Sequence, residues 1–99
     1  MIKVKVEKQN ISILGHADYD DYGKDIVCAS VSSIVMCSVE AIANFDTLAI
    51  DIKQSENKTE IFINSEDDIT KKLINNMLNC LKELEKKYPK NIEIIDKEE

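Results

Sequence analysis

The sequence predicts an α/β fold: a single compact domain with the element order β-β-α-β-β-α-β, a mixed sheet and two helices. Short segments with an apolar residue at every second position occur in pairs. Each pair precedes a long segment whose apolar residues recur every three or four positions. The length of 99 residues fits one hydrophobic core and no second one, so residues 1–99 are expected to form one domain.

The first half is predicted to form a hairpin followed by a helix. Apolar and charged residues alternate over 2–6, and the extended pattern resumes over 11–14 after a turn signal at Gln9-Asn10. Residues 26–42 then carry a helical apolar stripe, and Asp25 before them is a good N-cap residue. The stripe consists of Val27, Val31, Ile34, Val35, Val39 and Ile42. Because this segment has so little charge, we expect the sheet and a partner subunit to cover it.

The second half repeats the pattern. Two strands, 48–53 and 59–64, are joined by a polar turn, and Ser65 and Asp68 form a pair that resembles a capping box. A helix follows until a proline stops it, and the chain returns as a last strand over 91–95. The apolar face of this helix is predicted to consist of Ile69, Leu73, Met77, Cys80, Leu81, Leu84 and Tyr88.

Charge and composition argue against several classes of protein. The formal net charge of -6 argues against nucleic-acid binding, which needs a clustered basic face. The first residues alternate apolar and charged side chains, unlike a signal peptide, and the longest uncharged run, 26–39, looks too short to span a bilayer. We therefore expect a cytoplasmic protein without membrane association.

The chain has three cysteines and one histidine. An odd number of cysteines without CxxC spacing does not predict a disulfide framework, and one histidine leaves a His/Cys metal site short of ligands. No metal and no cofactor are predicted. The cysteines are expected to be reduced thiols, and one of them can be reactive.

His16 and Cys28 lie at opposite ends of the predicted loop. His16 ends a strand and Cys28 begins a helix, so a strand-loop-helix unit can bring them together. The positive end of the helix dipole favours a thiolate, and an imidazole can take the thiol proton, as in the Cys-His pair of nucleophilic catalysis. The backbone amides of Cys28 and Ala29 are expected to be free to bind an oxyanion. A cysteine in an apolar helix is most often a small core residue, and the residue types alone leave that interpretation open.

The residues around this pair resemble the signature of a known family. Gly-His-Ala at 15–17, a five-residue loop, Gly-Lys at 23–24 and Asp-Ile-Val-Cys-Ala-Ser-Val-Ser at 25–32 are similar to the ribosomal-processing cysteine protease family, Prp. The resemblance implies a bacterial peptidase that removes an N-terminal extension from a large-subunit ribosomal protein after a Phe-Phe pair. It places the family's histidine and cysteine on His16 and Cys28. It also implies a homodimer and a mobile loop that orders over the substrate.

The resemblance adds two supporting positions. The family's aspartate falls on Asp25 and its serine, one turn after the nucleophile, on Ser32. Asp25 is either only the N-cap or a third catalytic member that orients His16, and its position three residues before Cys28 favours the cap. Ser32 shares the helix face of Cys28, so it either contacts the substrate or packs inside the protein.

The loop itself is acidic and bracketed by glycines. Gly15 and Gly23 are predicted to be hinges for the loop 17–22, and Gly15→Ala is expected to lower turnover with little change in melting temperature if the native backbone angle accepts a side chain. Tyr19 and Tyr22 either cover an aromatic pair of the substrate or are solvated. The loop carboxylates are expected to attract the Lys- and Arg-rich tails of ribosomal proteins. They belong to Asp18, Asp20 and Asp21.

The two other cysteines, Cys37 and Cys80, are predicted to be core residues of the apolar stripes. Cys28 is therefore expected to be the fastest thiol to react with an alkylating reagent.

The leading prediction is thus a cysteine endopeptidase whose substrate is a ribosomal protein precursor. Two alternatives remain open on the sequence. One is a non-catalytic module that binds basic ribosomal protein tails through the acidic loop. The other is a thiol hydrolase that acts on small amides or esters with the same Cys-His pair.

Overall fold

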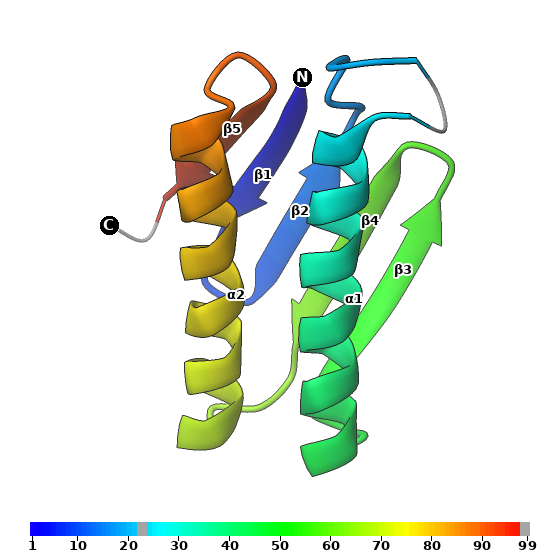
Figure 1. The fold of residues 1–99 in the computed structure, drawn as a ribbon. Helices are drawn as coiled ribbons and strands as arrows, with labels where there is room; N and C mark the ends of the chain where they lie inside the picture. The colour runs from blue at the N-terminus through cyan, green and yellow to red at the C-terminus, as the bar shows by residue number, and fades with distance from the viewer. Residues whose placement is uncertain (22–23, 98–99) are drawn as a thin grey trace.

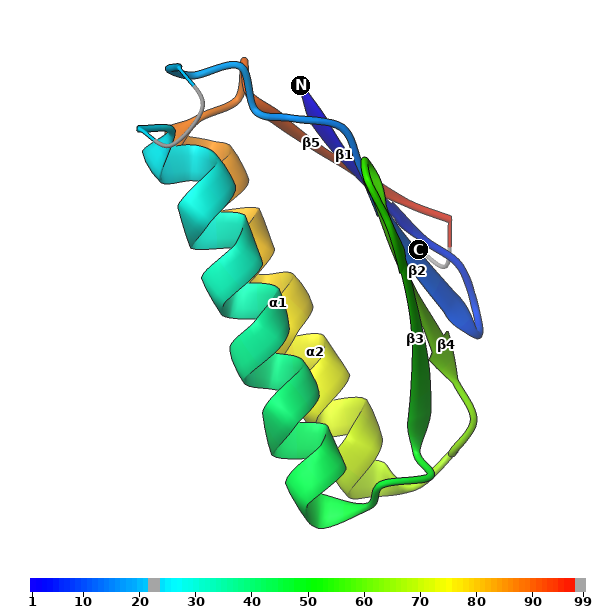
Figure 2. The same cartoon turned by 90° about the vertical axis from the view of Figure 1, so that its right-hand side faces the viewer.

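The computed structural model describes residues 1–21 and 24–97. Its elements are, in chain order, β1 (Ile2–Val6), β2 (Asn10–Leu14), α1 (Ile26–Phe45), β3 (Ile50–Ser55), β4 (Lys58–Ile63), α2 (Asp68–Lys87) and β5 (Ile92–Asp96). The two helices lie side by side (Figure 1), and both cover the same face of the sheet (Figure 2). The predicted α/β class and element order are confirmed.

The five strands form one mixed sheet in the order β3-β4-β2-β1-β5. The pair β1–β5 is parallel, and the other three pairs are antiparallel. In β1 the alternating sequence becomes alternating burial, because Ile2, Val4 and Val6 lie in the core and the lysines between them are exposed.

The pairing of β2 with β4 determines what lies beside the predicted site. Leu14, the last residue of β2, is opposite Lys58, the first residue of β4. The residues that follow β2 therefore emerge next to the turn between β3 and β4.

That turn is tighter than the sequence predicts. Strand β3 begins at Ile50 rather than at 48, and Leu48, expected in the strand, is 81% exposed. Only Glu56 and Asn57 separate β3 from β4. The polar residues that indicated a longer turn continue the ladder instead, because β3 is an edge strand whose side chains are mostly exposed to water.

Helix α1 presents its predicted stripe to the core. Ile34 is partly buried against the same cluster. The fully buried members of the stripe are Val27, Val31, Val35, Val39 and Ile42.

Helix α1 is longer than its uncharged run, because it continues past Glu40 to Phe45. Among the described residues it is the one helix that is long and apolar enough to cross a membrane, with a mean hydropathy of 2.0. The expectation that this segment is too short to span a bilayer is therefore wrong. Core helices of globular proteins have the same composition, and the valines of α1 belong to the core cluster.

Helix α2 differs from its prediction at its start and on its buried face. The N-cap is Asp67, whose carboxylate accepts the N–H groups of Ile69 and Thr70. Ser65, which was expected to cap the helix together with Asp68, instead accepts the N–H of Asp67 with its side-chain oxygen. Ile69 is exposed because the buried face is rotated toward Thr70, a polar residue that an apolar pattern does not include. The buried residues are Thr70, Ile74, Met77, Leu78 and Leu81.

Candidate active site

The end of β2 and the start of α1 lie at the same end of the molecule, drawn uppermost in Figure 1. The loop between them therefore closes on itself, and a pocket of about 480 Å³ opens there. His16 and Cys28 both line this pocket, as the sequence predicts. The described residues that line it are His16, Asp18, Asp20, Asp25, Cys28, Ala29 and Ser32.

The thiol of Cys28 is half-buried and contacts the residue after His16. The backbone N–H of Ala17 donates to Sγ of Cys28 over 3.2 Å. Ala17 is itself buried, and the side-chain amide of Asn91 donates to its carbonyl oxygen over 2.9 Å. These two hydrogen bonds hold the backbone of Ala17, next to His16, against the thiol.

The imidazole of His16 lies beside the β3–β4 turn. Its Nε2 is 2.8 Å from Oδ1 of Asn57, and the backbone N–H of Gly15 donates to the carbonyl oxygen of the same Asn57 over 3.0 Å. Reasoning from the sequence missed Asn57. Its only local signal is that of a turn residue, and the contact depends on the pairing of β2 with β4.

Asp25 joins the helix start to the loop. Its Oδ1 accepts the N–H groups of Val27 and Cys28, each over 3.0 Å, so the predicted N-cap is confirmed. Its Oδ2 accepts the N–H groups of Tyr19 and Asp20, over 2.9 and 3.3 Å. Desolvation raises the pKa of Asp25, but these four backbone donors outweigh it and hold the pKa below its ordinary value.

These contacts overturn the expected oxyanion site. The N–H of Cys28 donates to the Asp25 carboxylate, and the N–H of Ala29 donates to the Asp25 carbonyl oxygen over 3.1 Å. Both amides are therefore occupied. The sequence argument failed for two reasons. The Asp25 carboxylate caps the N–H of Cys28, and the N–H of Ala29 already makes the first intrahelical hydrogen bond, to the carbonyl oxygen four residues earlier.

Gly15 has a backbone conformation that disfavours a side chain. Its φ is +85°, and a Cβ placed there would lie 2.8 Å from the carbonyl oxygen of Met1. Gly15→Ala was expected to leave the melting temperature almost unchanged if the backbone angle at this position accepts a side chain. The angle disfavours a side chain, so the substitution introduces backbone strain. Gly23, the other predicted hinge, lies outside the described residues.

The described part of the loop is anchored at several points. The ring of Tyr19 packs edge-on against Tyr88, with centroids 5.3 Å apart and planes at 81°. Asp18 has a φ of 56° and pairs with the N-terminal ammonium group over 3.0 Å. Tyr22 lies outside the described residues. Mobility of the loop, implied by the family resemblance, stays a prediction.

The two other cysteines are not in the core. Cys37 and Cys80 are both exposed, so the prediction that burial protects them is wrong. Among the described residues, no three His, Cys, Asp or Glu side chains are grouped so that they could hold a metal ion.

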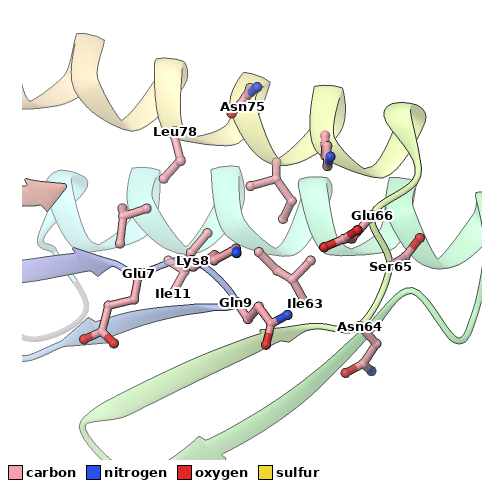
Figure 3. A pocket seen from close by; sticks show the side chains of 13 residues that line it. Glu7, Lys8, Gln9, Ile11, Ile63, Asn64, Ser65, Glu66, Asn75 and Leu78 are labelled. Atoms are coloured by element: carbon pink, nitrogen blue, oxygen red, sulfur yellow. The ribbon is translucent and has the colours of Figure 1, made fainter. Parts of the chain in front are cut away.

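A second cavity, of about 320 Å³, lies at the opposite end of the sheet from the start of α1 (Figure 3). Side chains of Lys8, at the β1–β2 turn, Ile63, at the end of β4, and Asn75 and Leu78, on α2, line it together with others. None of the predicted site residues within 1–21 and 24–97 lines this cavity.

A thiol at a helix start that shares a pocket with an imidazole, on this two-layer fold, defines a cysteine-dependent hydrolase. The sequence model of the family described as Cysteine protease Prp matches residues 1–93. A relative from Staphylococcus aureus (strain Mu50 / ATCC 700699), the "Ribosomal processing cysteine protease Prp", is 36% identical over 83 residues, which are 81% of this chain and 78% of the relative. The chain belongs to the Prp family of cysteine proteases.

Solved structures agree with this assignment. A Staphylococcus aureus Prp with a covalently linked product peptide is similar with a TM-score of 0.86 and 28% identity, and the match covers 97% of each chain. The same protease with a substrate peptide has a TM-score of 0.80 and 27% identity, again over 97% of each chain. A Streptococcus mutans protein with a TM-score of 0.76 and 21% identity shares the fold.

Proposed function

We propose that this protease removes an N-terminal extension from the precursor of a large-subunit ribosomal protein, with Cys28 as nucleophile and His16 as base. The observation that carries the proposal is the pocket that His16 and Cys28 share. In it, the thiol accepts a hydrogen bond from the backbone N–H of Ala17, the residue after His16. The Staphylococcus aureus relative is named for ribosomal processing, and its structures hold a substrate peptide and a covalently linked product peptide. These support the same reaction class here.

The proposed reaction proceeds through a thioester. His16 takes the proton of Cys28, and sulfur attacks the carbonyl carbon of the scissile bond to form a C–S bond. The proton passes from His16 to the leaving nitrogen as the C–N bond breaks. His16 next takes a proton from water while the water oxygen attacks the thioester carbon, and the C–S bond breaks. The proton then returns to sulfur, which restores the thiol.

The acidic loop supplies a reason for substrate preference. Asp18 and Asp20 line the pocket, and Asp18 is already paired with the N-terminal ammonium group. Asp20 is therefore the stronger candidate to attract a Lys- or Arg-rich precursor. The proposal places the protein in the cytoplasm, where thiols remain reduced and precursors are made.

The proposal includes a homodimer formed through the outer face of α1. Two large apolar side chains, Ile26 and Met36, are 52% and 46% exposed on a helix that carries one charged residue, Glu40. Such a face favours burial against a second copy. Sedimentation should show that Met36→Glu weakens the dimer and that Ile52→Glu, a matched change on β3, does not. A monomeric wild-type protein contradicts this part of the proposal.

The substrate is tested by mixing the protein with a ribosomal protein precursor and, separately, with the same protein lacking the extension. Mass spectrometry should find one new N-terminus in the precursor and none in the shortened protein. A precursor that binds but stays intact would favour the non-catalytic binding module. Hydrolysis of small amide or ester substrates with no cleavage of the precursor would favour the small-molecule thiol hydrolase.

A further inference from the structure

We propose that Asn57 is a positioning residue that holds the His16 imidazole in one tautomer, with its proton on Nε2. The other ring nitrogen, Nδ1, is then the one that takes the proton of Cys28. This inference rests on the proposed function, because it gives His16 the role of base.

The geometry that carries the inference is a double contact from one residue. Oδ1 of Asn57 lies 2.8 Å from Nε2 of His16, and the backbone oxygen of Asn57 accepts the N–H of Gly15 over 3.0 Å. One contact fixes the backbone that carries the histidine, and the other fixes its ring. The imidazole is exposed and has no other hydrogen bond among the described residues, so the orientation of the ring depends on Asn57.

The sheet keeps Asn57 in this position. The last residue of β3, Ser55, pairs with the first residue of β4, Lys58, and the latter is also opposite Leu14. Asn57 therefore directly precedes Lys58, the residue at which both antiparallel ladders end. A group on such a rigid element holds a partner more accurately than a group on a free loop.

The tautomer follows from the chemistry of the two groups. An amide oxygen only accepts hydrogen bonds, so the ring nitrogen that faces it carries the proton. Neutral imidazole has one N–H, which leaves the lone pair on Nδ1. When Nδ1 takes the thiol proton, Nε2–H can keep its hydrogen bond to Asn57, because the two ring nitrogens serve different partners.

The neutral amide has a further consequence. A carboxylate in the same place would favour the protonated ring, whereas an amide orients the ring without adding a charge. Asp25, the charged residue that was considered for this role, has both its oxygens occupied by backbone N–H groups. The structure therefore assigns orientation of His16 to Asn57 and binding of the loop to Asp25.

The test compares three variants with the wild-type protein on a cleaved precursor peptide. Asn57→Ala should lower kcat about 100-fold and leave KM nearly unchanged, because it misplaces a reacting group without removing a substrate contact. Asn57→Asp keeps an acceptor for Nε2–H, so it should recover at least about tenfold over Asn57→Ala. Its carboxylate favours the protonated ring, which cannot act as the base, so the low-pH limb of its kcat/KM profile should move to higher pH. Glu56→Ala, in the same turn, should match the wild type.

A spectroscopic measurement tests the tautomer independently of catalysis. The chain has one histidine, so a two-bond ¹H–¹⁵N correlation spectrum of labelled protein contains one imidazole. At a pH high enough to keep the ring neutral in every variant, the wild type and Asn57→Asp should show the proton on Nε2 alone, and Asn57→Ala should show a mixture of tautomers. Thermal unfolding of each variant, in which the backbone bond to Gly15 is retained, reports whether the fold is intact.

Three results would overturn the inference. The first is an Asn57→Ala variant that cleaves at the rate of Glu56→Ala. The second is an Asn57→Asp variant no more active than Asn57→Ala, which is the result expected if the amide instead donates to Nε2. The third is a wild-type spectrum with the proton on Nδ1. If the wild type cleaves no precursor, the proposed function fails, and the spectrum still decides the contact between Asn57 and His16.

Discussion

The backbone N–H of Ala17 donates to the sulfur of Cys28 over 3.2 Å, across the base of a loop that separates them by 11 positions. This contact ties the segment after β2, which carries the candidate base, to the helix that carries the candidate nucleophile. It also gives Cys28 a feature that the structure gives to neither of the other thiols, a backbone donor aimed at sulfur.

Cys28 should therefore react first with iodoacetamide at mildly acidic pH. It shares a pocket with His16, the candidate proton acceptor, whereas Cys37 and Cys80 are exposed thiols in later turns of their helices. Because all three are accessible in part, the chemistry rather than burial decides the order. Timed labelling and peptide mapping measure it. Earlier labelling of Cys37 or Cys80 would count against an activated Cys28.

Gly15→Ala should destabilise the protein. The residue has a φ of +85° and its new Cβ would meet the Met1 carbonyl oxygen at 2.8 Å. Backbone strain of this kind costs about 1–3 kcal/mol. Urea unfolding measures the loss, and an unchanged free energy of unfolding would show that the chain relaxes at this position.

Asp25→Ala should lower the melting temperature at pH 7 and increase hydrogen exchange at Tyr19 and Asp20, which lose their shared acceptor. The pKa of folded Asp25 lies below its ordinary value, so the ionised group stabilises the fold above the unfolded pKa of about 3.9. That stabilisation is lost as the pH falls through the folded pKa. The difference in melting temperature between variant and wild type should therefore shrink at acidic pH.

Asp67→Ala is the matched control for that experiment. Asp67 caps α2 in the same way, by accepting the N–H groups of Ile69 and Thr70, but it holds no loop amide. It should lower the melting temperature without changing exchange at Tyr19 and Asp20. Equal exchange rates in the two variants would show that Asp25 does not anchor the loop.

Asp20→Asn should raise KM for a basic precursor peptide at low salt and change kcat little. The carboxylate lines the pocket and attracts positive charge from a distance. The difference in KM between Asp20→Asn and the wild type should become smaller as salt is added, since exposed charges are screened beyond about 10 Å at 0.1 M. Kinetics at several salt concentrations measure this difference in KM. A difference that does not depend on salt would argue for a direct contact between Asp20 and the peptide instead.

The elements of this fold were predictable because their signals are local. Alternation in 2–6 and the valine stripe of α1 follow directly from the periods of strand and helix. The N-cap at Asp25 and the helix start that carries Cys28 were predictable for the same reason, because both signals lie within a short stretch. His16 was expected to end a strand, but β2 ends two residues earlier, at Leu14.

What the sequence did not predict depends on packing between distant segments. Asn57 reaches His16 from 41 positions away, and only the pairing of β2 with β4 brings it there. Exposure of Cys37 and Cys80 depends on how each helix is rotated against the sheet. The occupied amide at Cys28 depends on a carboxylate geometry that residue type suggests but does not fix, and the amide of Ala29 is occupied by the backbone oxygen of Asp25.

The central claim, acyl transfer by Cys28 with His16 as base, is tested most directly by single-turnover cleavage of a precursor with intact-mass detection of the protein. Wild type and a Cys37→Ala/Cys80→Ala control should cleave equally and carry a transient acyl group on Cys28. Cys28→Ala and His16→Ala should lose about three orders of magnitude or more in rate while they remain folded, because nucleophile and base act as one unit. Cleavage by either variant at more than about a tenth of the wild-type rate, or an acyl group on another cysteine, would contradict the claim.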